Sequence, residues 1–102
     1  MVKVSTYKEA EMLINNNIQK NTKIIIVYGR GDNGKTHLMR NADTRDYNLV
    51  FEYTDILELG FINNDKTTDK FIVELHDDEE LSYFDTCSCS IVIIDMNRVK
   101  MK

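Results

Sequence analysis

The chain has 102 residues, of which 42% are hydrophobic and 29% are charged. This length and composition predict one small globular domain with a modest core, and leave no room for a full-sized nucleotide-hydrolysing motor domain. The formal net charge is −4, with acidic residues concentrated in HDDEE at 76–80, which argues against a nucleic-acid surface built from clustered lysine and arginine.

The first residues, MVKVSTYKEAE, lack the apolar segment of a signal peptide. The longest apolar run, 24–28, is far shorter than the ~18 residues of a membrane-spanning helix. We therefore expect a cytoplasmic protein without membrane contact. Cys87 and Cys89 alternate along a predicted strand, where a bridge between them would be strained, so reduced thiols are expected.

The first predicted helix spans residues 7–19. Thr6 and Glu9 have the spacing of a capping box, which marks a helix start. The apolar residues that follow recur at helical intervals and are Ala10, Leu13, Ile14 and Ile18.

The rest of the chain alternates between strand and helix patterns. The segment KIIIVY at 23–28 contains four successive β-branched residues and predicts a strand buried on both faces, as in a parallel sheet. A helix is expected at about 34–45, and further strands at about 48–54, 71–76 and 88–95. This order predicts an α/β fold, a small three-layer P-loop-type domain with a mainly parallel sheet of about four strands.

The stretch GRGDNGKT at 29–36 fits the pattern G-x-x-x-x-G-K-[ST] without a mismatch. Glycines let the backbone curl so that successive N–H groups point at a phosphate, and the positive end of the following helix adds to the attraction. Lys35 is expected to reach the β and γ phosphates, and the Thr36 hydroxyl to bind Mg²⁺. The residues expected to contact nucleotide are Gly29, Arg30, Gly31, Asp32, Asn33, Gly34, Lys35, Thr36 and His37.

A second feature is the apolar run IVIID at 91–95. It is expected to deliver the Asp95 carboxylate to the carboxyl edge of the sheet, where it can hold Mg²⁺ near Thr36. Lys35 and Asp95 are therefore the expected catalytic residues, and Thr36 and Asp95 the expected metal ligands. The alternative is that Asp95 is simply the solvated end of a buried strand.

The segments YGRGDNGKT and IVIIDMN together resemble the P-loop NTPase superfamily, and the ending NGKT is similar to viral superfamily 3 helicase and primase-helicase ATPase cores. The resemblance implies that residues 1–102 form a truncated P-loop domain that binds ATP or GTP with Mg²⁺. It also implies a small viral protein, in the host cytoplasm or the virion. Its partners would be the nucleotide and another protein chain or a second copy, with nucleic acid supported only weakly.

The sequence departs from hydrolytic members of that superfamily after Asp95. The next residue is Met96, where an acid usually orients the attacking water, and the sequence ends before strands that would carry a sensor residue and an arginine finger. We therefore expect weak or partner-dependent hydrolysis. The alternative is a non-catalytic virion structural or assembly protein that keeps the fold. A small nucleotide kinase is a third possibility, although no lid segment follows Asp95.

Other residues with metal-binding or nucleophilic chemistry are His37, His76, Cys87 and Cys89. Cys-x-Cys without regular histidine spacing is a poor zinc signature, and no base for a cysteine nucleophile lies nearby in sequence. Thiols packed in a strand are the preferred interpretation.

Overall fold

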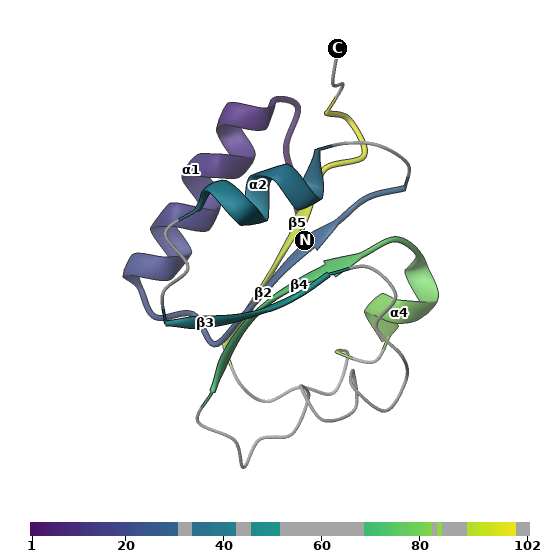
Figure 1. Ribbon diagram of the computed structural model, residues 1–102. Coiled ribbons are helices and arrows are strands. Elements are labelled where there is room, and N and C mark those ends of the chain that lie inside the picture. Colours follow the sequence, from purple (N-terminus) through teal and green to yellow (C-terminus); the bar gives the residue numbers. More distant parts are fainter. Residues whose placement is uncertain (31–33, 43–45, 52–68, 83, 85–89, 100–102) are drawn as a thin grey trace.

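The computed structural model describes residues 1–30, 34–42, 46–51, 69–82, 84 and 90–99 (Figure 1). Within these residues five strands form one parallel sheet, in the order β1-β5-β2-β4-β3, with three helices packed around it. The strands are β1 (Val2–Lys3), β2 (Ile24–Tyr28), β3 (Tyr47–Val50), β4 (Lys70–Leu75) and β5 (Ile91–Asp95). The helices are α1 (Tyr7–Gln19), α2 (Lys35–Asn41) and α4 (Asp78–Ser82).

Helix α1 has the predicted bounds. The Thr6 backbone is extended and its hydroxyl accepts a hydrogen bond of 3.2 Å from the Glu9 amide, which is the expected cap. Ala10 and Ile14 are fully buried. The capping residues and the apolar spacing therefore determine this helix together.

The expected parallel sheet is confirmed. Strand β2 lies at its centre, with all five residues buried and with β4 and β5 paired in parallel on its two sides. The sheet has five strands where about four were expected, because β1 pairs with β5 at one edge through Val2 and Lys3. Two residues are too few to show a strand pattern in the sequence.

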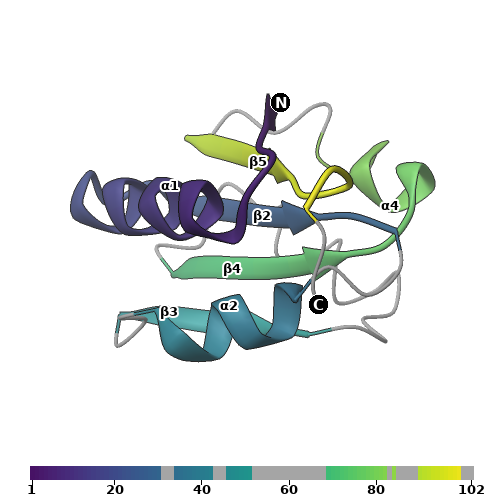
Figure 2. The same cartoon turned by 90° about the horizontal axis from the view of Figure 1, so that it is seen from above.

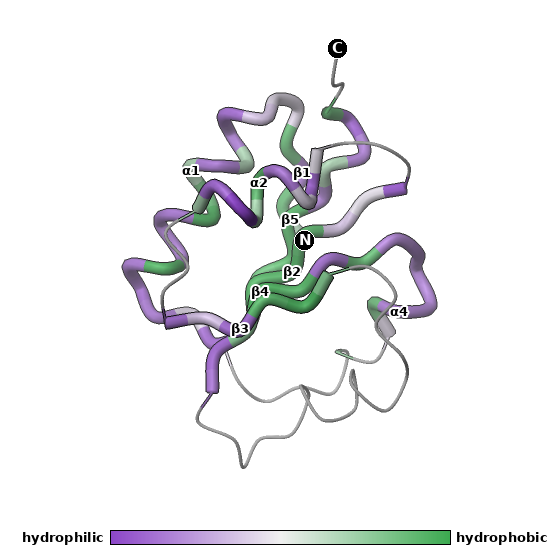
Figure 3. The backbone as a smooth tube through the Cα atoms, in the orientation of Figure 1, coloured by the Kyte–Doolittle hydropathy of each residue, from purple (hydrophilic) through white to green (hydrophobic). Residues whose placement is uncertain are grey.

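Helices cover both faces of the sheet (Figures 1 and 2). Helices α1 and α2 cover one face, here named the α1/α2 face, and α4 lies on the opposite face, here named the α4 face. Figure 3 shows hydrophobic residues concentrated in the central strands between these layers. Fully buried residues on the α1/α2 face are Ala10, Ile14, Ile25, Val27, Met39, Ile72, Ile94 and Met96. Their counterparts on the α4 face include Ile24, Ile26, Val73 and Leu75.

Several element bounds differ from those predicted. Helix α2 ends at Asn41, because Ala42 already has an extended backbone. Strand β3 ends at Val50 and β5 begins at Ile91. The rest of the predicted helix at 43–45 and the predicted strand residues 52–54 and 88–89 lie outside the described residues.

The acidic stretch 76–80 includes the start of α4, which the sequence reasoning did not predict. Asp77 accepts a hydrogen bond of 3.0 Å from the Glu80 amide, and Glu80 accepts one of 3.3 Å from the Asp77 amide. These reciprocal bonds form a capping box that starts the helix. None of the helices in the described ranges is long and apolar enough to cross a membrane.

Candidate functional site

The motif at 29–36 lies at the carboxyl edge of the sheet, between the end of β2 and the start of α2. Gly34, the residue before α2, has φ 78° and ψ 19°, a left-handed conformation that favours glycine. Gly31, Asp32 and Asn33 lie outside the described residues, so their predicted contacts with nucleotide stay predictions. Gly34 thus has a local structural reason to be glycine.

A cluster of three polar side chains, Lys35, Thr36 and Glu74, lies where α2 begins. The Thr36 hydroxyl donates a hydrogen bond of 2.7 Å to Oε1 of Glu74 on the neighbouring strand β4. Glu74 and Lys35 are each only 3% exposed. The site therefore brings a hydroxyl and a carboxylate together, one residue away from a buried lysine.

Glu74 was missed by the sequence reasoning, which predicted a strand at 71–76 but assigned no role to its acidic residue. Every residue of β4 from Phe71 to Leu75 is buried, and Glu74 is the one acid among them. Burying a carboxylate without partners is costly. An acid among the apolar residues of 71–75 was therefore the sequence signal that could have pointed to Glu74 as a site residue.

Asp95 lies apart from this group. Its Oδ1 accepts a hydrogen bond of 2.8 Å from the Asn97 amide, two residues along the chain. Alternation along β5 puts Asp95 on the same side as Ile91 and Ile93, which pack on the α4 face. The structure joins Thr36 to Glu74 rather than to Asp95, and the metal-binding role predicted for Asp95 stays a prediction.

The first amides of the motif bond to neighbouring strands. The Gly29 amide donates to the Leu75 carbonyl at 3.2 Å, and the Arg30 amide donates to Oδ1 of Asn97 at 2.7 Å. These two N–H groups are therefore engaged by the protein itself. Amides that point at a phosphate are expected only beyond Arg30.

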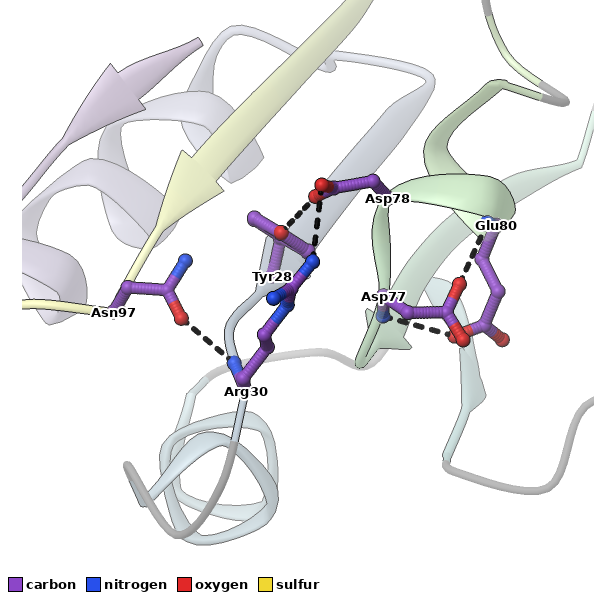
Figure 4. Close-up of polar contacts among 6 residues, drawn as sticks. All are labelled: Tyr28, Arg30, Asp77, Asp78, Glu80 and Asn97. Carbon is purple, nitrogen blue, oxygen red and sulfur yellow. Dashed lines mark hydrogen bonds and ion pairs between the residues drawn. The ribbon is translucent and has the colours of Figure 1, made fainter.

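The Arg30 side chain belongs to a second polar group, on the α4 side of β2 (Figure 4). Its guanidinium forms an ion pair of 3.0 Å with Asp78, and both side chains are about two thirds exposed. The Tyr28 hydroxyl also donates a hydrogen bond to Asp78. This bond raises the pKa of Tyr28 above its usual value, and burial and the Asp78 charge raise it further. We call Tyr28, Arg30 and Asp78 the Asp78 cluster.

His37 is exposed on α2 and turns toward α1. Its Nε2 lies 3.0 Å from the side-chain nitrogen of Asn41, and its ring lies 5.8 Å from the ring of Tyr7, between centroids. These contacts account for the His37 side chain without a ligand, and its predicted contact with nucleotide stays a prediction.

No cluster of three or more potential metal-binding side chains of the His, Cys, Asp and Glu types occurs within the part of the chain that the structure describes. Cys87 and Cys89 lie outside that part, so the four-residue zinc alternative has only His37 and His76 within it. His37 is on α2 and His76 follows β4.

Comparison of the chain with protein-family models, with curated proteins and with solved structures gave no match.

Proposed function

We propose that the chain binds a purine nucleoside triphosphate, ATP or GTP, together with Mg²⁺ at residues 29–36. The observation that carries the proposal is the 2.7 Å hydrogen bond between Thr36 and Glu74, next to the buried Lys35. Hydroxyl and carboxylate oxygens are ligands that suit Mg²⁺, and the pattern assigns the adjacent lysine to the phosphates. A hydroxyl, a carboxylate and a lysine thus lie close together at the start of α2, with Glu74 supplying the carboxylate in place of the expected Asp95.

The direction of this hydrogen bond supports a metal-facing role for Thr36. A hydroxyl has one proton and two lone pairs, and Thr36 gives its proton to Glu74. Its lone pairs are then oriented away from Glu74, where they are able to bind a cation. Thr36 would hold Mg²⁺ and Glu74 would orient Thr36, while the bound ion would offset the phosphate charge.

Lys35 supports phosphate binding through its burial. A charge at 3% exposure is shielded from water, so its attraction for a phosphate is stronger than that of a surface lysine. The chain as a whole is acidic, with a net charge of −4, so this local attraction must overcome a general repulsion. We therefore expect modest affinity.

Hydrolysis is proposed to be weak or to depend on a partner. Met96, which follows Asp95, is fully buried on the α1/α2 face, and its thioether has no acid or base chemistry. An arginine supplied by another chain would be one way for a partner to raise the rate.

Calorimetric titration with Mg·ATP and Mg·GTP tests the binding proposal. We expect binding by the wild type, and a loss of about 100-fold or more in Lys35→Ala, because a charge-assisted contact with phosphate is removed. Lys70→Ala is the matched control, since Lys70 starts β4 and contacts Asn21 at the opposite edge of the sheet. No binding by the wild type at millimolar nucleotide, or equal binding by Lys35→Ala, would contradict the proposal.

A second candidate is a non-catalytic virion structural or assembly protein. It is favoured by the fact that Gly29, Arg30 and Thr36 already bond to other parts of the chain, so these residues are held without a ligand. Sedimentation over a range of concentrations distinguishes the candidates. Self-association that is unchanged by Mg·ATP and by Lys35→Ala would favour the structural protein.

A further inference from the structure

Strand β5 and the residues after it hold the start of the motif. The Met96 amide donates to the Tyr28 carbonyl at 2.7 Å, and Asn97 Oδ1 accepts from the Arg30 amide at the same distance. On the other side of β2, the Leu75 carbonyl accepts from Gly29. The last strand residue and the first two motif residues are thus fixed by both neighbouring strands.

The contact between Asn97 and Arg30 depends on a turn after β5. The Asn97 amide donates to the carboxylate of Asp95 at 2.8 Å, so it bonds within its own turn. This bond between residues two apart is typical of aspartate, and it turns the chain so that the Asn97 side chain meets Arg30 (Figure 4). The buried Asp95 therefore acts on the motif through Asn97.

We propose that Asp95 and Asn97 are positioning residues that fix where the phosphate loop leaves the sheet. The inference rests on the proposed function, because that function makes 29–36 the phosphate loop. It gives Asp95 a role that differs from the metal-binding role predicted from its sequence context. Arg30 is held twice, by Asn97 at its main chain and by Asp78 at its side chain.

Amide hydrogen exchange tests the positioning contact without any nucleotide. The Arg30 amide should exchange slowly in the wild type, and about tenfold or more faster in Asn97→Ala, because its acceptor is removed. Asn97→Asp keeps an oxygen at this position and should restore the protection. The Ile25 amide in the centre of β2 reports whether the sheet stays intact. Fast exchange of Arg30 in the wild type, or unchanged exchange in Asn97→Ala, would overturn the proposal.

Nucleotide titration then separates positioning from metal binding. Asn97→Ala and Asp95→Ala should each weaken binding by about three- to tenfold, equally with Mg²⁺ and with EDTA, because each loses one hydrogen bond. The double variant should be no weaker than Asn97→Ala, since both residues act along one path. Asn48→Ala is the matched control, an asparagine whose side chain donates to a main-chain carbonyl on β4.

A loss in Asp95→Ala that occurs only with Mg²⁺ would overturn the proposal and favour a metal ligand at Asp95. Additive losses in the double variant would overturn it as well. If the wild type binds no nucleotide, the proposed function fails, while exchange at Arg30 still decides whether Asn97 holds the start of the motif. The two failures are therefore distinguishable.

Discussion

The two strands that flank β2 each carry one carboxylate near the carboxyl edge, and the two carboxylates have different surroundings. Glu74 is paired across from Val27, whereas Asp95 is paired across from Tyr28, one position further along β2. Because side chains alternate, one position moves a side chain to the other face of the sheet. Glu74 meets α2 at Thr36, and Asp95 instead caps its own turn.

An acid that ends an apolar strand is therefore not always the carboxylate that contacts Thr36 at the start of α2. Both β4 and β5 contain such a run, and the more familiar pattern, an acid at the end of the strand, is the one on β5. Whether a strand carboxylate can contact Thr36 depends on the face of the sheet that its side chain occupies, because α2 lies on the α1/α2 face.

The largest expected effect tests which side chains of β5 lie on the α1/α2 face and which lie on the α4 face. Ile94 is fully buried on the α1/α2 face, whereas Ile93 is only half-buried on the α4 face. Ile94→Ala should lower the free energy of unfolding by about 2–5 kcal/mol, because it leaves a cavity, and Ile93→Ala by about half as much. Urea unfolding of both variants measures the difference. The reverse order would mean that the two faces of β5 have been assigned wrongly.

The next effect tests which carboxylate supports the binding of the proposed Mg²⁺. Glu74→Gln keeps an oxygen for the Thr36 hydroxyl but removes the charge, so the gain in nucleotide affinity from Mg²⁺ should fall by about 10–100-fold. Binding in EDTA should change much less. Nucleotide titrations with Mg²⁺ and with EDTA measure the two affinities. Thr36→Ser is the control, because it keeps the hydroxyl. A larger loss of the Mg²⁺ effect in Asp95→Ala than in Glu74→Gln would reverse the comparison.

A smaller effect concerns the helix on the α4 face. Asp77 accepts from the Glu80 amide at the start of α4, so Asp77→Ala should lower the free energy of unfolding by about 1 kcal/mol. Glu79→Ala is the matched control, since the Glu79 side chain is exposed, and it should stay within about 0.5 kcal/mol of the wild type. Denaturant unfolding compares the two. Equal losses would show that α4 needs no cap.

The smallest effect is a dependence on alkaline pH from the Asp78 cluster. The pKa of Tyr28 is raised from 10.0 by its hydrogen bond to Asp78, so above pH 10 the unfolded chain loses this proton before the folded chain does. Stability should therefore fall as pH rises past 10, and fall less steeply in Tyr28→Phe. Some slope should remain, because burial also raises the pKa of Tyr47. Melting temperatures between pH 8 and about 11 measure both slopes, and identical slopes would contradict the prediction.

Much of the fold could be predicted, because its signals are local. Thr6 with Glu9 gives the start of α1, and the β-branched run 24–27 gives the strand β2, which lies at the centre of the parallel sheet. The edge strand β1 and the helix α4 were missed. Two residues of β1 pair only because β5 offers them an edge, and the acidic α4 shows no apolar periodicity.

The candidate site likewise combines local features that the sequence could predict with tertiary contacts that it could not. The strand before the motif, the glycine at 34, and the lysine and threonine that open α2 could be predicted from sequence, because each depends on neighbours in the chain. The carboxylate that meets Thr36 and the residue that holds the Arg30 amide became visible only in the folded chain. These contacts join residues 38 and 67 positions apart, and they depend on strand order and register, which no local pattern records.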